Sequence, residues 1–387
     1  MLIIMRRTRL ARAAFGLLLA LAAILLSTGF ALAAEDDGLT ELIDQSGIGA
    51  ATDSLSPSTR ELMRELGMDE LSLSAVLALS PKSFLRLMAR LAVDRLARPA
   101  KGAAALCSVT LLCAAAESLK LRPDDKTLAG VAGVVGSLCC CAAVAVPAWT
   151  LIGSVCSALG ECAEFLLSFI PVYAGVLAAG GQPAAAAAYN AALFGVAEVS
   201  GQLAADTVKP LAGIFLALAL VGAVAPSFGL AGIAGGVKRA VNWALGIIST
   251  VFVGVLGLQG TVGTVADSVT MKTARFAVSS AVPVVGGALA DAMSSAAGYI
   301  GLLRSVVGAI GIAAGAAIFM PVTVELVLWR LGMGVVSLFA GAAGVEGISK
   351  AADAAGDVFE MLLALMLSML LIVIVTTGIM AAVGNAR

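Results

Sequence analysis

The 387-residue sequence contains no histidine, and only 13% of its residues are charged and 5% aromatic. The absence of histidine excludes Ser-His-Asp and Cys-His catalysis, histidine metal ligands and histidine-based pH switching. The glycine-rich runs carry no following Lys-Ser/Thr, so any energy from ATP would have to come from a partner ATPase. Because no nucleophile and base stand together and no basic surface carries interleaved aromatics, we expect no enzyme, no cofactor and no nucleic-acid partner.

The seven cysteines all lie between Cys107 and Cys162, in apolar surroundings. The consecutive residues 139–141 point in three directions on a helix, so they cannot converge on one metal ion. We interpret the cysteines as small buried hydrophobic residues and expect no metal site.

Apolar residues make up 60% of the chain, and the mean hydropathy is +1.03. A soluble domain is about half apolar and about a quarter charged, so this composition predicts an all-α polytopic membrane protein with about 8–10 helices. A membrane span needs about 20 apolar residues. Candidate spans are 102–119, 128–152, 184–205, 208–232, 238–260, 298–319, 321–343 and 358–382, and two further segments, 163–182 and 275–293, are interrupted by proline and glycine. Many small residues favour a compact bundle.

The N-terminus has the pattern of an export signal. Four arginines between positions 6 and 12 precede an apolar run and an Ala-x-Ala site at 31–33. This predicts a signal peptide over 1–33, with an uncleaved first membrane helix as the alternative. Both interpretations place residues 34–101 on the extracytoplasmic side. A polytopic membrane domain then occupies 102–387.

Residues 34–101 divide into an acidic and a basic part. The part between residues 34 and 81 contains ten acidic residues and only two arginines. A capping box is expected at Ser58–Glu61 and the end of a helix at Gly67. A basic amphipathic helix is expected over 81–98, ending at Pro99. It would lie among lipid headgroups or pack on a partner or on the acidic part.

The membrane domain contains a predicted internal duplication, with repeat 1 at about 155–265 and repeat 2 at about 266–382. Residues 168–178 align with 280–290, Tyr189 with Tyr299, and Pro210 with Pro321. The proline and tyrosine matches carry weight because the chain has only 11 prolines and 3 tyrosines. Duplicated membrane domains often place discontinuous helices near the midplane. Candidate broken-helix or pore residues are therefore Pro171, Gly175, Pro283, Gly286, Gly287, Pro210 and Pro321, with plain kinked helices as the alternative.

Charged residues in or near the spans form a second candidate set, because such residues are costly in lipid. They are Glu161, Glu164, Asp267, Lys272, Arg275, Asp291, Arg304 and Glu325. Glu161 and Glu164 align with Lys272 and Arg275, which suggests either direct pairing or inverted repeats. We also expect Asp291 to pair with Arg304, and Glu325 to face Arg330 or Arg304. The alternative is that several of these residues, near the ends of spans, lie at the membrane interface. We expect holding helices in register, and not a role in a pore, to be their main role.

One region resembles a known family. It comprises Leu258–Gly260, Asp267, Lys272–Phe276, Pro283–Gly287, Asp291-Ala292, Leu303-Arg304, Val307-Gly308 and Pro321. These residues, and the layout of a signal, a short polar region and many spans, resemble the stage III sporulation protein AE family. The resemblance implies a protein of the mother-cell membrane around the forespore, in a multiprotein channel with other membrane proteins of the same complex. No enzymatic activity is attached to this family.

Three functions follow as hypotheses from the sequence. The chain is a subunit of a sporulation channel or secretion-like complex, a self-contained secondary transporter using the duplicated broken helices, or a scaffold that recruits partners through residues 34–101. The resemblance favours the first hypothesis. The residues alone leave the first two open.

Overall fold

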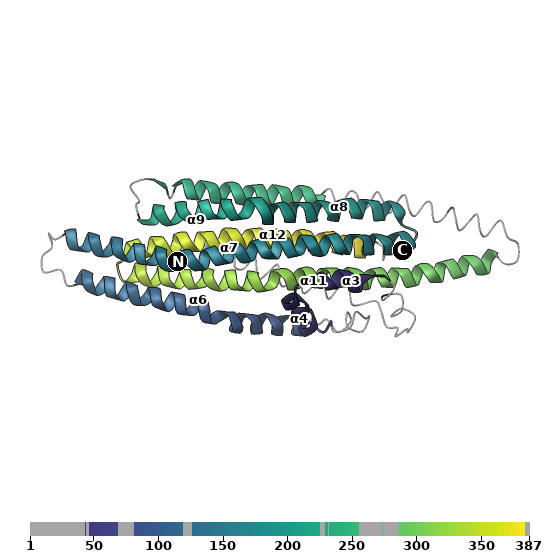
Figure 1. Cartoon of the computed structure of the whole chain (residues 1–387), viewed down its shortest axis with the longest axis horizontal. Helices are drawn as coiled ribbons and strands as arrows, with labels where there is room; N and C mark the ends of the chain where they lie inside the picture. Colours follow the sequence, from purple (N-terminus) through teal and green to yellow (C-terminus); the bar gives the residue numbers. More distant parts are fainter. Residues whose placement is uncertain are drawn as a thin grey trace.

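The computed structural model describes residues 43, 46–68, 81–118, 126–224, 229–230, 232–254, 273 and 286–383. Over these ranges the chain is helical and contains no strand. Long helices lie side by side along one axis and form an elongated bundle (Figure 1). The structure therefore confirms the all-α class predicted from composition.

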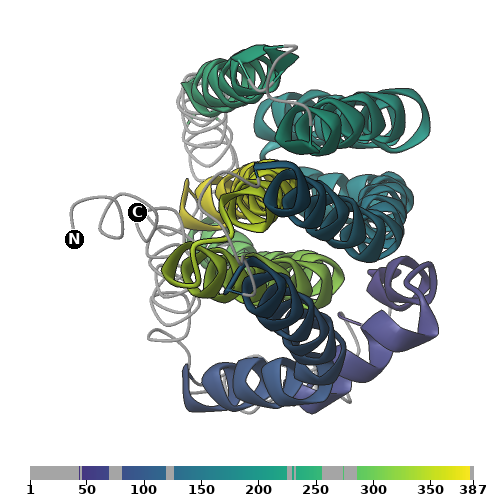
Figure 2. The same ribbon diagram turned by 90° about the vertical axis from the view of Figure 1, so that its left-hand side faces the viewer.

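The bundle consists of a few very long helices preceded by two short ones. Their bounds are α3 Ile48–Asp53, α4 Pro57–Glu65, α6 Pro81–Ser118, α7 Lys126–Ala179, α8 Pro183–Gln202, η2 Leu203–Thr207, α9 Val208–Val224, α11 Gly286–Ala342 and α12 Glu346–Val383. A further helical segment covers 232–254. Viewed along the axis, the helices stack in layers, with α11 and α12 packed along each other (Figure 2).

Several expected spans are joined into single helices. The expected span 128–152 and most of 163–182 lie in α7, which has 54 residues, and 298–319 and nearly all of 321–343 lie in α11, which has 57. At about 1.5 Å per residue these helices are about 81 and 86 Å long. Within the described residues, five helical stretches are long and apolar enough to cross a membrane.

Two glycines in left-handed conformation reverse the chain between long helices. Gly181 (φ 73°) lies between α7 and α8, and Gly344 (φ 80°) lies between α11 and α12. The backbone N–H of Gln182 donates to the carbonyl of Leu177, which closes the end of α7, and Pro183 then begins α8. Glycine after a helix and proline at the first position of the next are the usual residues for such a reversal. These short connections make consecutive helices antiparallel neighbours.

The core lies along α11. Residues 306–320 of this helix are buried on every side, and they are apolar throughout. Small residues allow close packing there: a Cβ at Gly311 would lie 2.6 Å from the Phe169 ring, and one at Gly315 would lie 3.0 Å from Val373. Phe169 belongs to a buried aromatic row on α7, with ring centroids 5.3 Å from Phe165 and 5.6 Å from Tyr173. Close approach through glycine is typical of membrane helix packing.

The N-terminal helices pack against this bundle. The N-cap of α4 is Ser56, whose hydroxyl accepts from the backbone N–H of Thr59, so the capping box expected at Ser58 is wrong by two residues. Pro57 explains the shift, because proline suits the first helical position. Gly67 (φ 92°) follows the end of α4, which confirms the expected stop.

The basic amphipathic helix is longer than expected and packs on protein. Pro99 does not end it, since α6 continues to Ser118. Its arginines reach other elements: Arg90 Nη1 lies 2.7 Å from a carboxylate oxygen of Glu65 in α4, and Arg95 Nη1 lies 2.8 Å from one of Glu325 in α11. Packing on the acidic part and on the bundle is therefore present, while contact of 81–98 with lipid headgroups stays a prediction.

Some predictions fall outside the described residues. These are the signal peptide at 1–33, Pro283, Asp267, Lys272 and Arg275. Most of the segment equivalent to the second half of α7 in repeat 2 is also outside, so the duplication and its domain boundaries stay a prediction.

Candidate functional site

A network of four charged side chains links three helices of the bundle. Lys238 Nζ lies 2.8 Å from a carboxylate oxygen of Asp357 and 2.8 Å from one of Glu360, and Arg330 Nη2 lies 3.6 Å from Glu360. The side chains of Lys238, Arg330 and Glu360 are 19%, 17% and 15% exposed. The two carboxylates and two cations balance each other, which offsets the desolvation that each charge suffers.

Local sequence explains how the network forms. Asp357 and Glu360 are three residues apart on α12, so they lie on one face of the helix. Gly356 leaves room for the long side chain from α11, because a Cβ there would lie 3.1 Å from Arg330 Nη1. The helical segment 232–254 brings Lys238 to the same face. The network therefore fixes the relative positions of the three helices.

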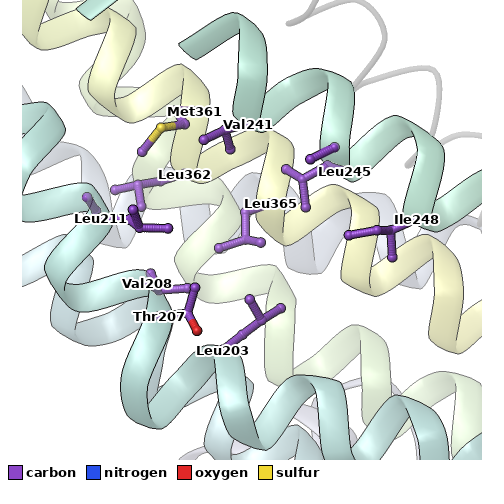
Figure 3. Close-up of a pocket in the computed structure, with 12 residues that line it drawn as sticks. Leu203, Thr207, Val208, Leu211, Val241, Leu245, Ile248, Met361, Leu362 and Leu365 are labelled. Carbon is purple, nitrogen blue, oxygen red and sulfur yellow. The ribbon is translucent and has the colours of Figure 1, made fainter. Parts of the chain in front are cut away.

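An apolar cavity of about 180 Å³ adjoins this network. Figure 3 shows side chains from η2, α9, the 232–254 segment and α12 pointing into it. The lining residues are Leu203, Thr207, Val208, Leu211, Ala212, Val241, Ala244, Leu245, Ile248, Met361, Leu362 and Leu365. Met361 directly follows Glu360, and Val241 is three residues from Lys238. The charge network and the cavity therefore lie next to each other along the same two helices, α12 and the 232–254 segment.

The cavity lies beside a π-helical turn. In η2 the backbone N–H of Val208 donates to the carbonyl of Leu203, five residues earlier, instead of four. Pro210 explains the departure, because its ring lacks an N–H and clashes with the carbonyl four residues before it, in Asp206. A single π-turn of this kind re-aims side chains and is often found at functional sites. Here it turns Leu203, Thr207 and Val208 toward the cavity.

The other predicted broken-helix residues lie in regular helix. Pro171 and Gly175 are inside α7 and Pro321 is inside α11, and both helices continue through them. Gly286 and Gly287 begin α11. The expected interruption is thus absent at Pro171 and Pro321, because the freed backbone groups of proline are tolerated inside membrane-type helices packed against neighbours. Only Pro210 coincides with a change of helix type among these described prolines.

The predicted charges are spread over separate places. Glu161 accepts a 2.9 Å hydrogen bond from the backbone N–H of Ser56, ahead of α4. Glu164 is exposed. Buried Arg304 donates from Nη1 to the side-chain oxygen of Gln182 at 2.8 Å. Asp291 lies in α11, with its side chain outside the described part.

The partner of Glu325 differs from the expectation. The carboxylate pairs with Arg95, whereas Arg330 turns to Glu360 and Arg304 to Gln182. Sequence reasoning missed Lys238, Asp357 and Glu360 as site residues. The available signal was the pair of acidic residues three positions apart, just before the uncharged end of α12. Within the described ranges no group of three metal-ligating side chains converges.

The long apolar helices, the buried central helix and the half-buried charge network together define a polytopic helical membrane protein. Comparison with known families makes this specific. The chain belongs to the stage III sporulation protein AE family, whose model matches residues 66–384. It is similar to stage III sporulation protein AE of Bacillus subtilis (strain 168), with 29% identity over 150 residues. That alignment covers 39% of this chain and 38% of the relative. No solved structure matches the chain.

Proposed function

We propose that the chain is an integral membrane subunit of a channel or secretion-like complex that links mother cell and forespore and is needed for forespore development. Family membership, which supports a role in sporulation, is the basis of this proposal. It would lie in the mother-cell membrane around the forespore, with residues 34–101 on the extracytoplasmic side. It would have no catalytic activity, and a partner ATPase of the same complex would supply energy.

The observation that carries this proposal is the burial of α11. Over residues 306–320 the helix is enclosed on every side by apolar side chains. A helix that is apolar all round occupies the centre of a packed bundle. The axis of the described bundle is therefore filled by protein, and a path for solute fits better between this chain and its partners than within the chain.

The outer surface of the bundle supports a subunit role as well. Large apolar side chains are exposed on α6, α7 and the 232–254 segment, including Leu112, Val146 and Trp243 at 72% each. Lipid and neighbouring membrane subunits are the two surroundings that suit such a surface. The continuous helices at Pro171 and Pro321 weaken the alternative of a self-contained transporter, which invoked breaks at these prolines.

A pull-down from sporulating cells tests the proposal. Tagged full-length chain should co-purify with several membrane proteins and an ATPase, and its deletion should block spore formation after engulfment. Purified chain in liposomes should move no solute. Ion-coupled uptake by the chain alone would identify a transporter. Normal spores from residues 34–101 on an unrelated membrane anchor would identify a scaffold, and either result would refute the channel subunit.

A further inference from the structure

The cavity beside the π-turn is open to the outer surface of the bundle. Leu211 of α9 and Ile248 of the 232–254 segment both line it, and they are 47% and 50% exposed. The floor is formed by α12, where Met361, Leu362 and Leu365 are 5%, 1% and 7% exposed. The cavity is therefore a slot between two outer helices that reaches a buried third one (Figure 3).

The lining leaves no polar group for a polar occupant. Thr207 is the one lining residue with a polar side chain, and its hydroxyl donates to the carbonyl of Gln202 at 3.4 Å. A buried water needs about two to four polar partners, whereas an engineered apolar cavity of about 150 Å³ stays dry and accepts benzene or xenon. An occupant of this slot must therefore be apolar.

The surroundings of the opening supply such an occupant. The surface next to the slot is formed by exposed apolar residues, among them Ile214, Trp243 and Val251. α9 belongs to the stretch Pro183–Val224, which is long and apolar enough to cross a membrane, and the 232–254 segment exposes large apolar side chains beside it, so this surface suits lipid hydrocarbon. We propose that the slot binds an acyl chain of a bilayer phospholipid, inserted between α9 and the 232–254 segment until its methylenes contact α12.

The shape of the slot favours a flexible hydrocarbon chain over a partner's side chain. Its walls come from an irregular π-turn on one side and a regular helix on the other, and a chain with many rotatable bonds follows such a surface. An empty slot would leave the lining side chains without contact on one side, which forfeits their dispersion energy. The lipid thus acts as a structural filler that couples α9, the 232–254 segment and α12.

Photolabelling of the full-length chain tests this site. The chain is reconstituted in phosphatidylglycerol liposomes containing a phosphatidylcholine with a diazirine in mid-acyl chain, irradiated, and mapped by peptide mass spectrometry. We expect adducts on Met361, Leu362 or Leu365, besides those on exposed Trp243. Bulk lipid reaches only the exposed surface, so adducts on the floor report a chain inside the slot.

Matched substitutions give the control. Ala244 lines the slot, whereas Ala240 lies one turn earlier on the same helix, is exposed and does not line it. Ala244→Phe should reduce floor adducts at least fivefold while Ala240→Phe leaves them unchanged. If Ala244→Phe fails to fold, Leu211→Phe closes the opening from α9, with the same expectation.

Three results would overturn the proposal. The first is a wild-type protein labelled at Trp243 and not on the α12 floor. The second is an equal effect of the two alanine substitutions. The third is floor labelling that occurs with purified protein but is lost in native membranes of sporulating cells, because a partner protein would then fill the slot.

Discussion

Gly311 provides the sharpest test of how α7 and α11 pack. A Cβ at this position would lie 2.6, 3.0 and 3.3 Å from three atoms of the Phe169 ring, where contact at about 3.5–4.0 Å is normal. The ring is fully buried between Phe165 and Tyr173 and cannot move aside freely. Overpacking of this kind costs about 1–3 kcal/mol. We therefore expect Gly311→Ala to destabilise the bundle.

Gly301 is the matched control on the same helix. A Cβ there would meet nothing within 4 Å, so Gly301→Ala should gain only helix propensity, up to about 1 kcal/mol. Both variants share that gain, and their difference in free energy of unfolding isolates the steric cost, about 1–3 kcal/mol. Denaturant titration of purified protein in detergent measures it, and Phe169→Leu should remove the difference. Equal stability of the two alanine variants would refute the packing described for α11.

Two further predictions concern charged residues. Lys238→Ala leaves the half-buried Glu360 with Arg330 as its more distant partner. We expect this change to lower the free energy of unfolding by about 3 kcal/mol at most. Lys350→Ala on the exposed surface is the control and should change it by less than about 0.5 kcal/mol in the same denaturant titration. Glu161→Ala removes the acceptor ahead of α4 and should speed proteolysis of residues 46–68 in membranes, unlike Glu164→Ala; equal rates would contradict the contact.

The sequence was sufficient for the fold class but not for the helix ends. Apolar composition alone predicts membrane helices, and the stop at Gly67 follows from its backbone freedom. Counting 20 apolar residues, however, cannot show where a helix ends, and the prolines wrongly predict breaks at Pro99, Pro171 and Pro321. The helix continues through each of these prolines because packing against neighbouring helices outweighs the loss of one backbone hydrogen bond.

For the charged residues, the sequence indicates which side chains are unusual but not which partners they contact. Glu161 and Glu325 stand out in the sequence because carboxylates are rare in such apolar surroundings. Their partners, Ser56 and Arg95, are far away along the chain, 105 and 230 residues distant, and no local pattern links them. Long-range pairing depends on how the helices are arranged in space, which periodicity does not reveal.

The helix α7 is longer than a lipid layer is thick. Its 54 residues rise about 81 Å, against about 30 Å of hydrocarbon. Even at a tilt of about 40°, the upper end of the range found for membrane helices, only about 40 Å of the helix would lie within the hydrocarbon. About half of α7 therefore projects beyond the lipid layer, where the proposed partner subunits could contact it.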